Sequence, residues 1–270
     1  ELTRLRADLD AATSRSKPPS RAVLEGRPIY DPDGLAVVPG PVPDLPSNFK
    51  ETDAIRKLRH LLTTADEAVH AVGFFGMGGI GKTVASTAIL RDEKVRQHFD
   101  QMVYLILGQN PVIDKVRDSA HVQLMGRRMN QECSEAEQVE ALRNAMAGKT
   151  ILLYLDDLWS PEVVTDLDFI DTSTSSRVLI STRIRGLCGR HAVEICKPTD
   201  TEAVRILMAA AKMPAGSAVP ADAVEIVKLC GHLPLALSIA GRLICELGLG
   251  THWTGLTDIL REELRDEFQT

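Results

Sequence analysis

The stretch Gly76-Met-Gly-Gly-Ile-Gly-Lys82-Thr83 fits the pattern G-x-x-x-x-G-K-[S/T] of a phosphate-binding loop, the Walker A motif, at every fixed position. The apolar run at 69–75 predicts a buried strand before it, and the run at 84–90 predicts the first turns of a helix after it. Glycines let the backbone wrap closely around a phosphate, and the helix N-terminus adds a partial positive charge there. The stretch therefore predicts a strand–loop–helix unit that binds phosphate groups.

Within this loop, the Lys82 ammonium is expected to neutralise the β- and γ-phosphates of a nucleotide, and the Thr83 hydroxyl to bind Mg²⁺. The other residues expected to contact the nucleotide are Gly76, Met77, Gly78, Gly79, Ile80, Gly81 and Val84. The alternative is a glycine-rich turn that merely joins a core strand to a core helix. The motifs further along the chain favour the nucleotide site over this alternative.

Composition excludes some classes of partner. The 270 residues include 31 Lys and Arg against 37 Asp and Glu, a formal charge of −6, which argues against a nucleic-acid or anionic-membrane surface. Five cysteines without C-x-x-C spacing indicate reduced thiols in a cytoplasmic compartment. No apolar run reaches membrane-spanning length and no signal peptide is visible. Because the sequence begins at Glu1, we expect a piece of a longer protein.

Patterning divides the chain into four regions. Residues 1–16 suit the tail of an amphipathic helix. Residues 17–48 hold eight of the 14 prolines and predict an extended linker that is not packed, whose end could lie over the nucleotide. Residues 49–197 are expected to form a nucleotide-binding domain, and residues 198–270 a small all-helical subdomain.

Strands alternate with helices in the third region. Apolar runs after the phosphate-loop strand lie at 102–107, 151–155, 177–181 and 192–196. This alternation predicts an α/β domain with a five-stranded parallel sheet covered by helices on both faces. A capping box at 134–137 begins one of these helices, and Gly148 can end it. In the last region, helices are expected from the capping box at Thr199 to Lys212, and over 221–230, 234–247 and 254–268.

The run Ile151-Leu-Leu-Tyr-Leu-Asp156-Asp157 is an apolar strand that ends in two carboxylates. A phosphate-loop NTPase needs an acid at a strand end beside the loop to hold Mg²⁺ through water, and Asp156 fits that role. Asp157 could orient or deprotonate the attacking water. A turn or helix cap after a buried strand is the alternative, and the Walker A motif upstream favours the functional interpretation.

The next strand ends in Thr182-Arg183, where an arginine could sense a γ-phosphate through charge-assisted hydrogen bonds. A solvated arginine after an edge strand is the simpler interpretation, and Arg185 and Arg190 compete for the same role. Further on, Gly231-His-Leu-Pro234 ends one helix and begins another. We expect His232 to be a turn residue and not a ligand.

With these motifs in order, the chain resembles the NB-ARC domain of the STAND class of NTPases, found in plant disease-resistance receptors and the apoptosome scaffold. The resemblance covers about residues 45–265. It rests on the phosphate loop and on three further segments: Leu152-Leu-Tyr-Leu-Asp-Asp-Leu-Trp159, Ser181-Thr-Arg183 and Gly231-His-Leu-Pro-Leu-Ala-Leu237. They correspond to the family's second kinase motif, its sensor and its G-L-P-L motif.

The resemblance implies a nucleotide-binding domain followed by a four-helix subdomain, with adenine nucleotide between them. It also implies that Pro234 contacts the base or ribose and that backbone near Phe49 lies on the other side. ADP would hold a closed state, exchange for ATP or dATP would drive self-association, and slow hydrolysis would reset the switch. Where the family usually has a Val-Gly-Arg-Glu-like segment, this chain has Phe49-Lys-Glu-Thr52, and His232 replaces a frequent glycine. No Met-His-Asp motif is present.

Two other classes remain open. A turnover enzyme, such as a small-molecule kinase or motor ATPase, could use the same core, although a helical subdomain stands where a kinase would carry an arginine-bearing lid. A nucleotide-free scaffold is the other class, and the intact loop and acid pair argue against it. No Asn-Lys-x-Asp guanine motif and no Leu-Ser-Gly-Gly-Gln transporter signature occurs. The leading expectation is a switch with weak ATPase activity, monomeric as this fragment.

Overall fold

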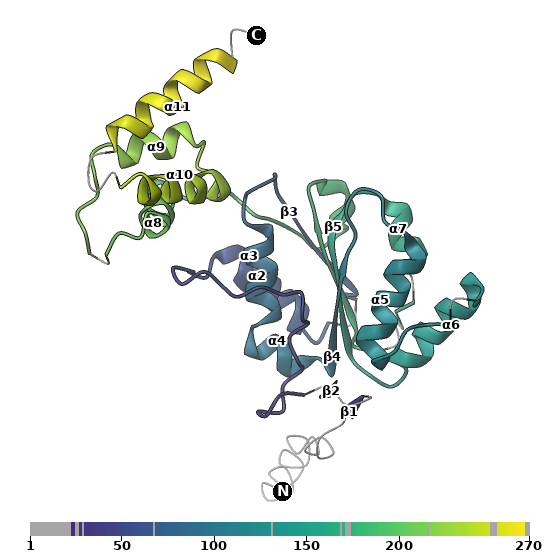
Figure 1. Cartoon of the computed structure of the whole chain (residues 1–270). Coiled ribbons are helices and arrows are strands. Elements are labelled where there is room, and N and C mark those ends of the chain that lie inside the picture. The colour runs from purple at the N-terminus through teal and green to yellow at the C-terminus, as the bar shows by residue number, and fades with distance from the viewer. Residues whose placement is uncertain are drawn as a thin grey trace, which may run out of the picture.

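The structure is a computed structural model that describes residues 23–24, 27–28, 30–66, 68–130, 132–167, 169–170, 174–214, 216–248 and 253–267. Strands β1 (Val23–Leu24) and β2 (Arg27–Pro28) form a short antiparallel ribbon. A five-stranded sheet with helices on both faces follows, and then a separate group of helices (Figure 1). The expected helix at 1–16 lies outside the described residues.

All neighbouring strands in the main sheet are parallel, as the sequence predicts. They are β3 (Ala71–Phe75), β4 (Gln101–Ile106), β5 (Ile151–Leu158), β6 (Arg177–Thr182) and β7 (Ala192–Glu194), in the order β4-β5-β6-β3-β7. Strand β6 lies between β3 and β5, although it follows both in the chain. The carboxyl ends of β3, β5 and β6 therefore meet at one edge, which brings the phosphate loop, the acid pair and the candidate sensor together.

Two layers of helices cover the sheet (Figure 1). Helices α2 (Asp53–Thr63), α3 (Lys82–Leu90) and α4 (Glu93–His98) cover one face, and α5 (Ile113–Met125), α6 (Glu135–Met146) and α7 (Pro161–Asp166) cover the other. The alternation of side chains along β5 separates the two cores: Leu152 and Tyr154 pack on the α3 side, and Leu153 and Leu155 on the α5 side. Asp156 continues the α3-side alternation.

The helical group comprises α8 (Asp200–Ala210), α9 (Ala223–Leu229), α10 (Pro234–Glu246) and α11 (Thr254–Glu267). The predicted capping boxes are present at the starts of α6 and α8. A core that includes the fully buried Trp253 holds the group together. Gly241 lets α10 approach α8 closely, because a Cβ there would lie 2.5 Å from the Ala210 Cβ. No helix within the described ranges combines the length and apolarity needed to cross a membrane.

Residues 30–46 of the proline-rich segment pack against α4 and the end of α3. This differs from the expectation of an unpacked linker. Ala36 is fully buried, its N–H donates to the Arg96 carbonyl over 3.2 Å, and its carbonyl accepts from Arg96 Nε over 2.8 Å. Arg91 Nε donates to the Pro43 carbonyl over 2.9 Å. The segment stays extended as predicted, because prolines lack the N–H that a helix or sheet needs. Arginines of α4 and the end of α3 supply the hydrogen bonds that dock it.

Candidate functional site

The phosphate loop joins β3 to α3, and its backbone is shaped by glycines at left-handed φ. Gly79 has φ +75° and Gly81, the residue that precedes α3, has φ +103°, a region where a side chain is strained. Among the described residues, no acceptor is bonded to the N–H groups of Gly78, Gly79 or Gly81. The first N–H groups of α3 also lack acceptors within the helix. The loop thus presents several unpaired donors at one helix N-terminus, which suits an anion.

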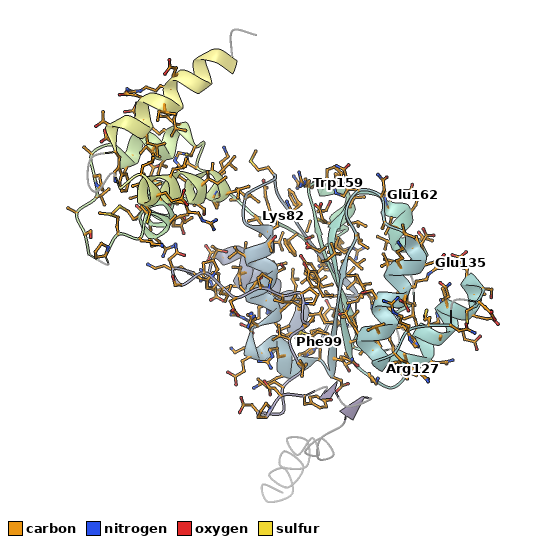
Figure 2. All side chains as sticks on the ribbon, viewed as in Figure 1. Lys82, Phe99, Arg127, Glu135, Trp159 and Glu162 are labelled. Carbon is orange, nitrogen blue, oxygen red and sulfur yellow. The ribbon has the colours of Figure 1, made fainter. Side chains whose placement is uncertain are left out.

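Lys82 begins α3, and Figure 2 shows it at the same edge of the sheet as Trp159, which follows β5. Its Nζ donates to two carbonyls of its own loop, Gly76 over 2.9 Å and Met77 over 3.2 Å. Burial, followed by the charge of Arg183, lowers the pKa of Lys82, while the carboxylates of Asp157 and Asp156 near the end of β5 act in the opposite direction. These carbonyl contacts hold the ammonium over the loop, where a bound phosphate would meet it.

Asp156 lies at the end of β5 and accepts hydrogen bonds from three hydroxyls. Oδ1 accepts from Tyr154 Oη and from Ser181 Oγ, each over 2.6 Å, and Oδ2 accepts from Tyr104 Oη over 2.7 Å. Burial, reinforced by the Asp156 carboxylate, raises the pKa of Tyr104 and of Tyr154, so both phenols remain donors. Sequence reasoning missed these partners. The one signal for them was Tyr154-Leu-Asp156, since residues i and i+2 of a strand share a face.

Asp157 faces a different set of groups, because the strand pairing shifts register between Leu155 and Leu158. Asp157 itself has φ +57°, which is uncommon for a residue with a side chain. Its N–H donates to Ser181 Oγ over 2.9 Å, and its Oδ2 accepts from Trp159 Nε1 over 3.0 Å. The fully buried Ser181 hydroxyl therefore bonds the carboxylate of Asp156 and the backbone N–H of Asp157.

Arg183 lies between the acid pair and the phosphate loop. Its Nε is 3.6 Å from Asp157 Oδ1, and its guanidinium carbon is 5.1 Å from the centre of the Trp159 ring. A Cβ on Gly78 would lie 3.3 Å from Arg183 Nη1. By contrast, the Arg185 guanidinium lies over the Phe75 ring at 5.6 Å. Of these two arginines, Arg183 is the one that the structure brings to the loop.

The helical group reaches the phosphate loop through the start of α10. Pro234 is the first residue of that helix, and the N–H of Leu235 donates to the Gly79 carbonyl over 3.1 Å. A Cβ on Gly79 would lie 3.0 Å from the Leu235 Cβ, so only glycine allows this approach without adjustment. His232 lies in the preceding turn with φ +63°, and its Nε2 is 2.6 Å from Asp200 Oδ1 at the start of α8.

The remaining predicted site residues are more dispersed. Phe49 packs against the core cluster beneath α2 and α3, and within the described residues no hydrogen bond or ion pair joins it to Pro234. In the helical group, hydrogen bonds from Thr199 lower the pKa of Glu202, and the charges of Arg205 and of Lys50, the residue after Phe49, lower it by smaller amounts. Ile80 is buried in the loop, Met77 is half exposed, and Val84 lies in the first turn of α3.

Thr83 and Asp156 are suited to a divalent cation such as Mg²⁺. Thr83 is exposed in the first turn of α3, and Asp156 is partly exposed at the strand end facing that helix. A hydroxyl and a carboxylate are the hard oxygen ligands that Mg²⁺ prefers, usually with several waters retained. In the same first turns of α3, Ser86 Oγ donates to the Thr83 carbonyl over 3.0 Å.

Comparison with known proteins identifies a family and relatives. A family model described as the NB-ARC domain matches residues 51–209, more than half of the 270 residues. Probable disease resistance protein At5g63020 of Arabidopsis thaliana is 26% identical over 208 residues, which are 72% of this chain and 23% of that protein. Disease resistance protein RPS5 of the same plant is 25% identical over 206 residues, with the same two shares. The chain spans about a quarter of the length of these relatives.

A solved structure shares the fold. The crystal structure of Cdc6p from Pyrobaculum aerophilum matches with a TM-score of 0.55, covering 82% of this chain and 66% of that one at 16% sequence identity. At this identity the match concerns the fold alone.

Proposed function

The chain belongs to the NB-ARC family of phosphate-loop NTPases, and on that basis we propose that it is an adenine-nucleotide switch that hydrolyses ATP slowly. The single observation that carries this proposal is the engagement of Asp157. Its carboxylate accepts a hydrogen bond from Trp159 and faces Arg183, so the candidate base is held by neighbours and not directed freely at a water. A turnover enzyme needs that base available in each cycle, whereas a switch benefits from restraining it.

In this proposal, each loop residue has a defined task. The unpaired N–H groups of Gly78, Gly79 and Gly81, together with the first N–H groups of α3, bind the α- and β-phosphates. Lys82 neutralises the β- and γ-phosphates. Arg183 exchanges Asp157 for the γ-phosphate, which distinguishes ATP from ADP. The position of the Arg183 side chain supports this exchange, because it lies between Gly78 of the loop and Asp157.

Thr83 and, through water, Asp156 would hold the metal ion that accompanies the nucleotide. Held there, Mg²⁺ would supply positive charge that offsets the negative charge of the phosphate groups. Asp157 orients the attacking water and accepts its proton once Arg183 has moved to the γ-phosphate. Ser181 links the two positions, because its hydroxyl donates to the Asp156 carboxylate and accepts from the Asp157 backbone N–H.

We propose that the adenine and ribose lie between Pro234 and the backbone near Phe49. The hydrogen bond from Leu235 to Gly79 supports this placement, because it brings the start of α10 to the phosphate loop. The same bond couples the helical group to the nucleotide, because a change in the conformation of the loop at Gly79 would move the start of α10. ADP would favour one arrangement of the two parts, and ATP or dATP another.

For the whole protein, we propose a role in defence signalling with nucleotide-controlled self-association in the cytoplasm. The relatives named above are disease resistance proteins, and this chain corresponds to about a quarter of their length. The five cysteines, all free thiols, are consistent with a reducing compartment.

The deciding experiment denatures the purified protein and identifies any released nucleotide by chromatography, followed by titration with Mg·ATP and Mg·ADP. We expect stoichiometric ADP, or saturable binding of both nucleotides if none is retained. Lys82→Ala should abolish binding. Lys149→Ala is the matched control, because Lys149 Nζ also donates to a backbone carbonyl, that of Ala145 at 2.9 Å, and burial likewise lowers its pKa.

Two outcomes would overturn the proposal. A wild-type protein that binds neither nucleotide is a scaffold. Sustained hydrolysis at about 10 per second, an ordinary enzyme rate, would identify a turnover enzyme and not a switch.

A further inference from the structure

The chain has three tyrosines, and the hydroxyl of each donates to an aspartate. Tyr30 donates to Asp100 over 3.1 Å, at the far end of β4 from the site. Tyr104 and Tyr154 both donate to Asp156. Two of the three phenols in the protein are therefore directed at the one carboxylate assigned to the metal.

The two phenols are held rigidly. Tyr104 and Tyr154 are directly opposite in the pairing of β4 with β5, and their rings stack with centroids 4.9 Å apart and planes 11° apart. Tyr154 is fully buried and Tyr104 is 6% exposed. Phe74 of β3 extends the stack, with its centroid 6.3 Å from that of Tyr154. Neither ring can turn without disturbing the core, so the positions of the hydroxyls are fixed by packing.

These hydroxyls use most of the acceptor capacity of Asp156. An ionised carboxylate offers about four lone-pair sites, and Tyr104, Tyr154 and Ser181 occupy three of them. Bonds of this length from a hydroxyl to a carboxylate are strong. About one site remains, which suits a hydrogen bond from a metal-bound water and leaves no pair of free oxygens to coordinate a metal in a bidentate manner.

We propose that Tyr104 and Tyr154 are positioning residues that orient Asp156 toward the water shell of the nucleotide-bound divalent cation. The inference rests on the proposed function and deepens it. Tyr104 has the larger effect, because it is the sole hydroxyl donor to Oδ2 within the described part of the chain, whereas Ser181 still holds Oδ1 when Tyr154 loses its hydroxyl. Without Tyr104 Oη, the carboxylate can rotate away from the cation.

A purely structural role makes a different prediction. If the phenols only satisfy buried polar groups, their removal changes the free energy of unfolding and leaves the coupling between metal and nucleotide unchanged. The informative quantity is therefore the ratio of ADP dissociation constants measured without and with Mg²⁺, because a general loss of stability does not alter this ratio in folded protein.

The experiment compares wild type, Tyr104→Phe, Tyr154→Phe and Tyr30→Phe by calorimetric titration with ADP, once in excess Mg²⁺ and once in EDTA. Each substitution removes one phenol hydroxyl and keeps the ring, and circular dichroism verifies the fold. We expect the ratio to fall by about tenfold in Tyr104→Phe, as for partners of metal ligands generally, and by less in Tyr154→Phe. Tyr30→Phe should stay within about twofold of wild type on the same scale.

The outcomes separate the two proposals. Wild type that fails to bind ADP overturns the proposed function, and this inference with it. Wild type that binds ADP with no dependence on Mg²⁺, or a Tyr104→Phe protein whose ratio is unchanged or increased, overturns the inference alone. If Tyr104→Phe does not fold, an unchanged ratio in Tyr154→Phe overturns it instead.

Discussion

The Arg183 Nε lies 3.6 Å from Oδ1 of Asp157, so the candidate sensor of the γ-phosphate and the candidate catalytic base face each other. Trp159 completes this arrangement, since its Nε1 donates to Asp157 and its ring lies under the guanidinium. The side chain of Arg183 is 48% exposed and that of Asp157 33%, so the ion pair itself contributes little to stability. The ion pair matters because it links the positions of the two side chains: a γ-phosphate that attracts Arg183 would also release Asp157.

Arg183→Ala should weaken binding of ATP and leave binding of ADP nearly unchanged. Hydrogen bonds to charged groups contribute about 1.5–3 kcal/mol, which corresponds to a loss of roughly 10- to 100-fold in ATP affinity. Titration of both nucleotides measures this directly. Arg185→Ala is the matched control, because the Arg185 guanidinium lies over Phe75. An equal loss for ATP and ADP would remove Arg183 from the sensor role.

Asp157→Asn should preserve nucleotide binding and slow hydrolysis. Asparagine tolerates the positive φ of this position and can still accept from Trp159, so the substitution isolates the charge. Loss of a general base typically slows a reaction by about 10²- to 10⁴-fold. Single-turnover release of phosphate from bound ATP measures the effect. If hydrolysis continued at the wild-type rate, Asp157 would have no part in proton transfer.

Gly79→Ala should weaken nucleotide binding by separating α10 from the loop. The added Cβ would meet the Leu235 Cβ at 3.0 Å, and a side chain at φ +75° adds strain of about 1–3 kcal/mol. We expect lower ADP affinity and a lower melting temperature. Gly255→Ala serves as the control, since a Cβ there meets open space at the start of α11. Unchanged affinity in Gly79→Ala would show that the contact with α10 does not support the site.

Arg96→Ala should release the proline-rich segment from the domain. Arg96 donates to the Ala36 carbonyl and pairs with Asp31, so its truncation leaves a buried carbonyl unsatisfied. Limited proteolysis followed by mass spectrometry should show faster cleavage within residues 30–46. Arg56→Ala is the comparison, because Arg56 forms ion pairs that are largely exposed. Equal cleavage of the two variants would mean that the segment is held by its apolar contacts alone.

Some of the site could be predicted because its signals are local. The spacing of glycines with Lys82 and Thr83 predicted the loop, and alternating apolar runs predicted the parallel sheet. Asp156 was expected at a strand end, because it directly follows the apolar run at 151–155. The capping boxes at Ser134 and Thr199 were predicted correctly, since each depends on residues three apart.

Contacts between distant segments could not be predicted in the same way. Tyr104 is 52 residues from Asp156, and Ser181 is 25 residues from it. Their meeting depends on strand order and register, and the insertion of β6 between β3 and β5 has no local sequence signal. The packing of residues 30–46 was missed for a related reason: the arginines that bond their carbonyls lie 48 and 60 residues away.

The sequence by itself determined the chemistry: a phosphate loop, two acids, an arginine after the next strand, and a proline-led helix. The tertiary structure decided how that chemistry is arranged, with Asp156 held by three hydroxyls, Asp157 turned toward Trp159 and Arg183, and Leu235 bonded to Gly79. The reason is physical. Loop and cap conformations depend on neighbouring residues, whereas the partners of a side chain depend on which strands and helices pack together across the whole chain.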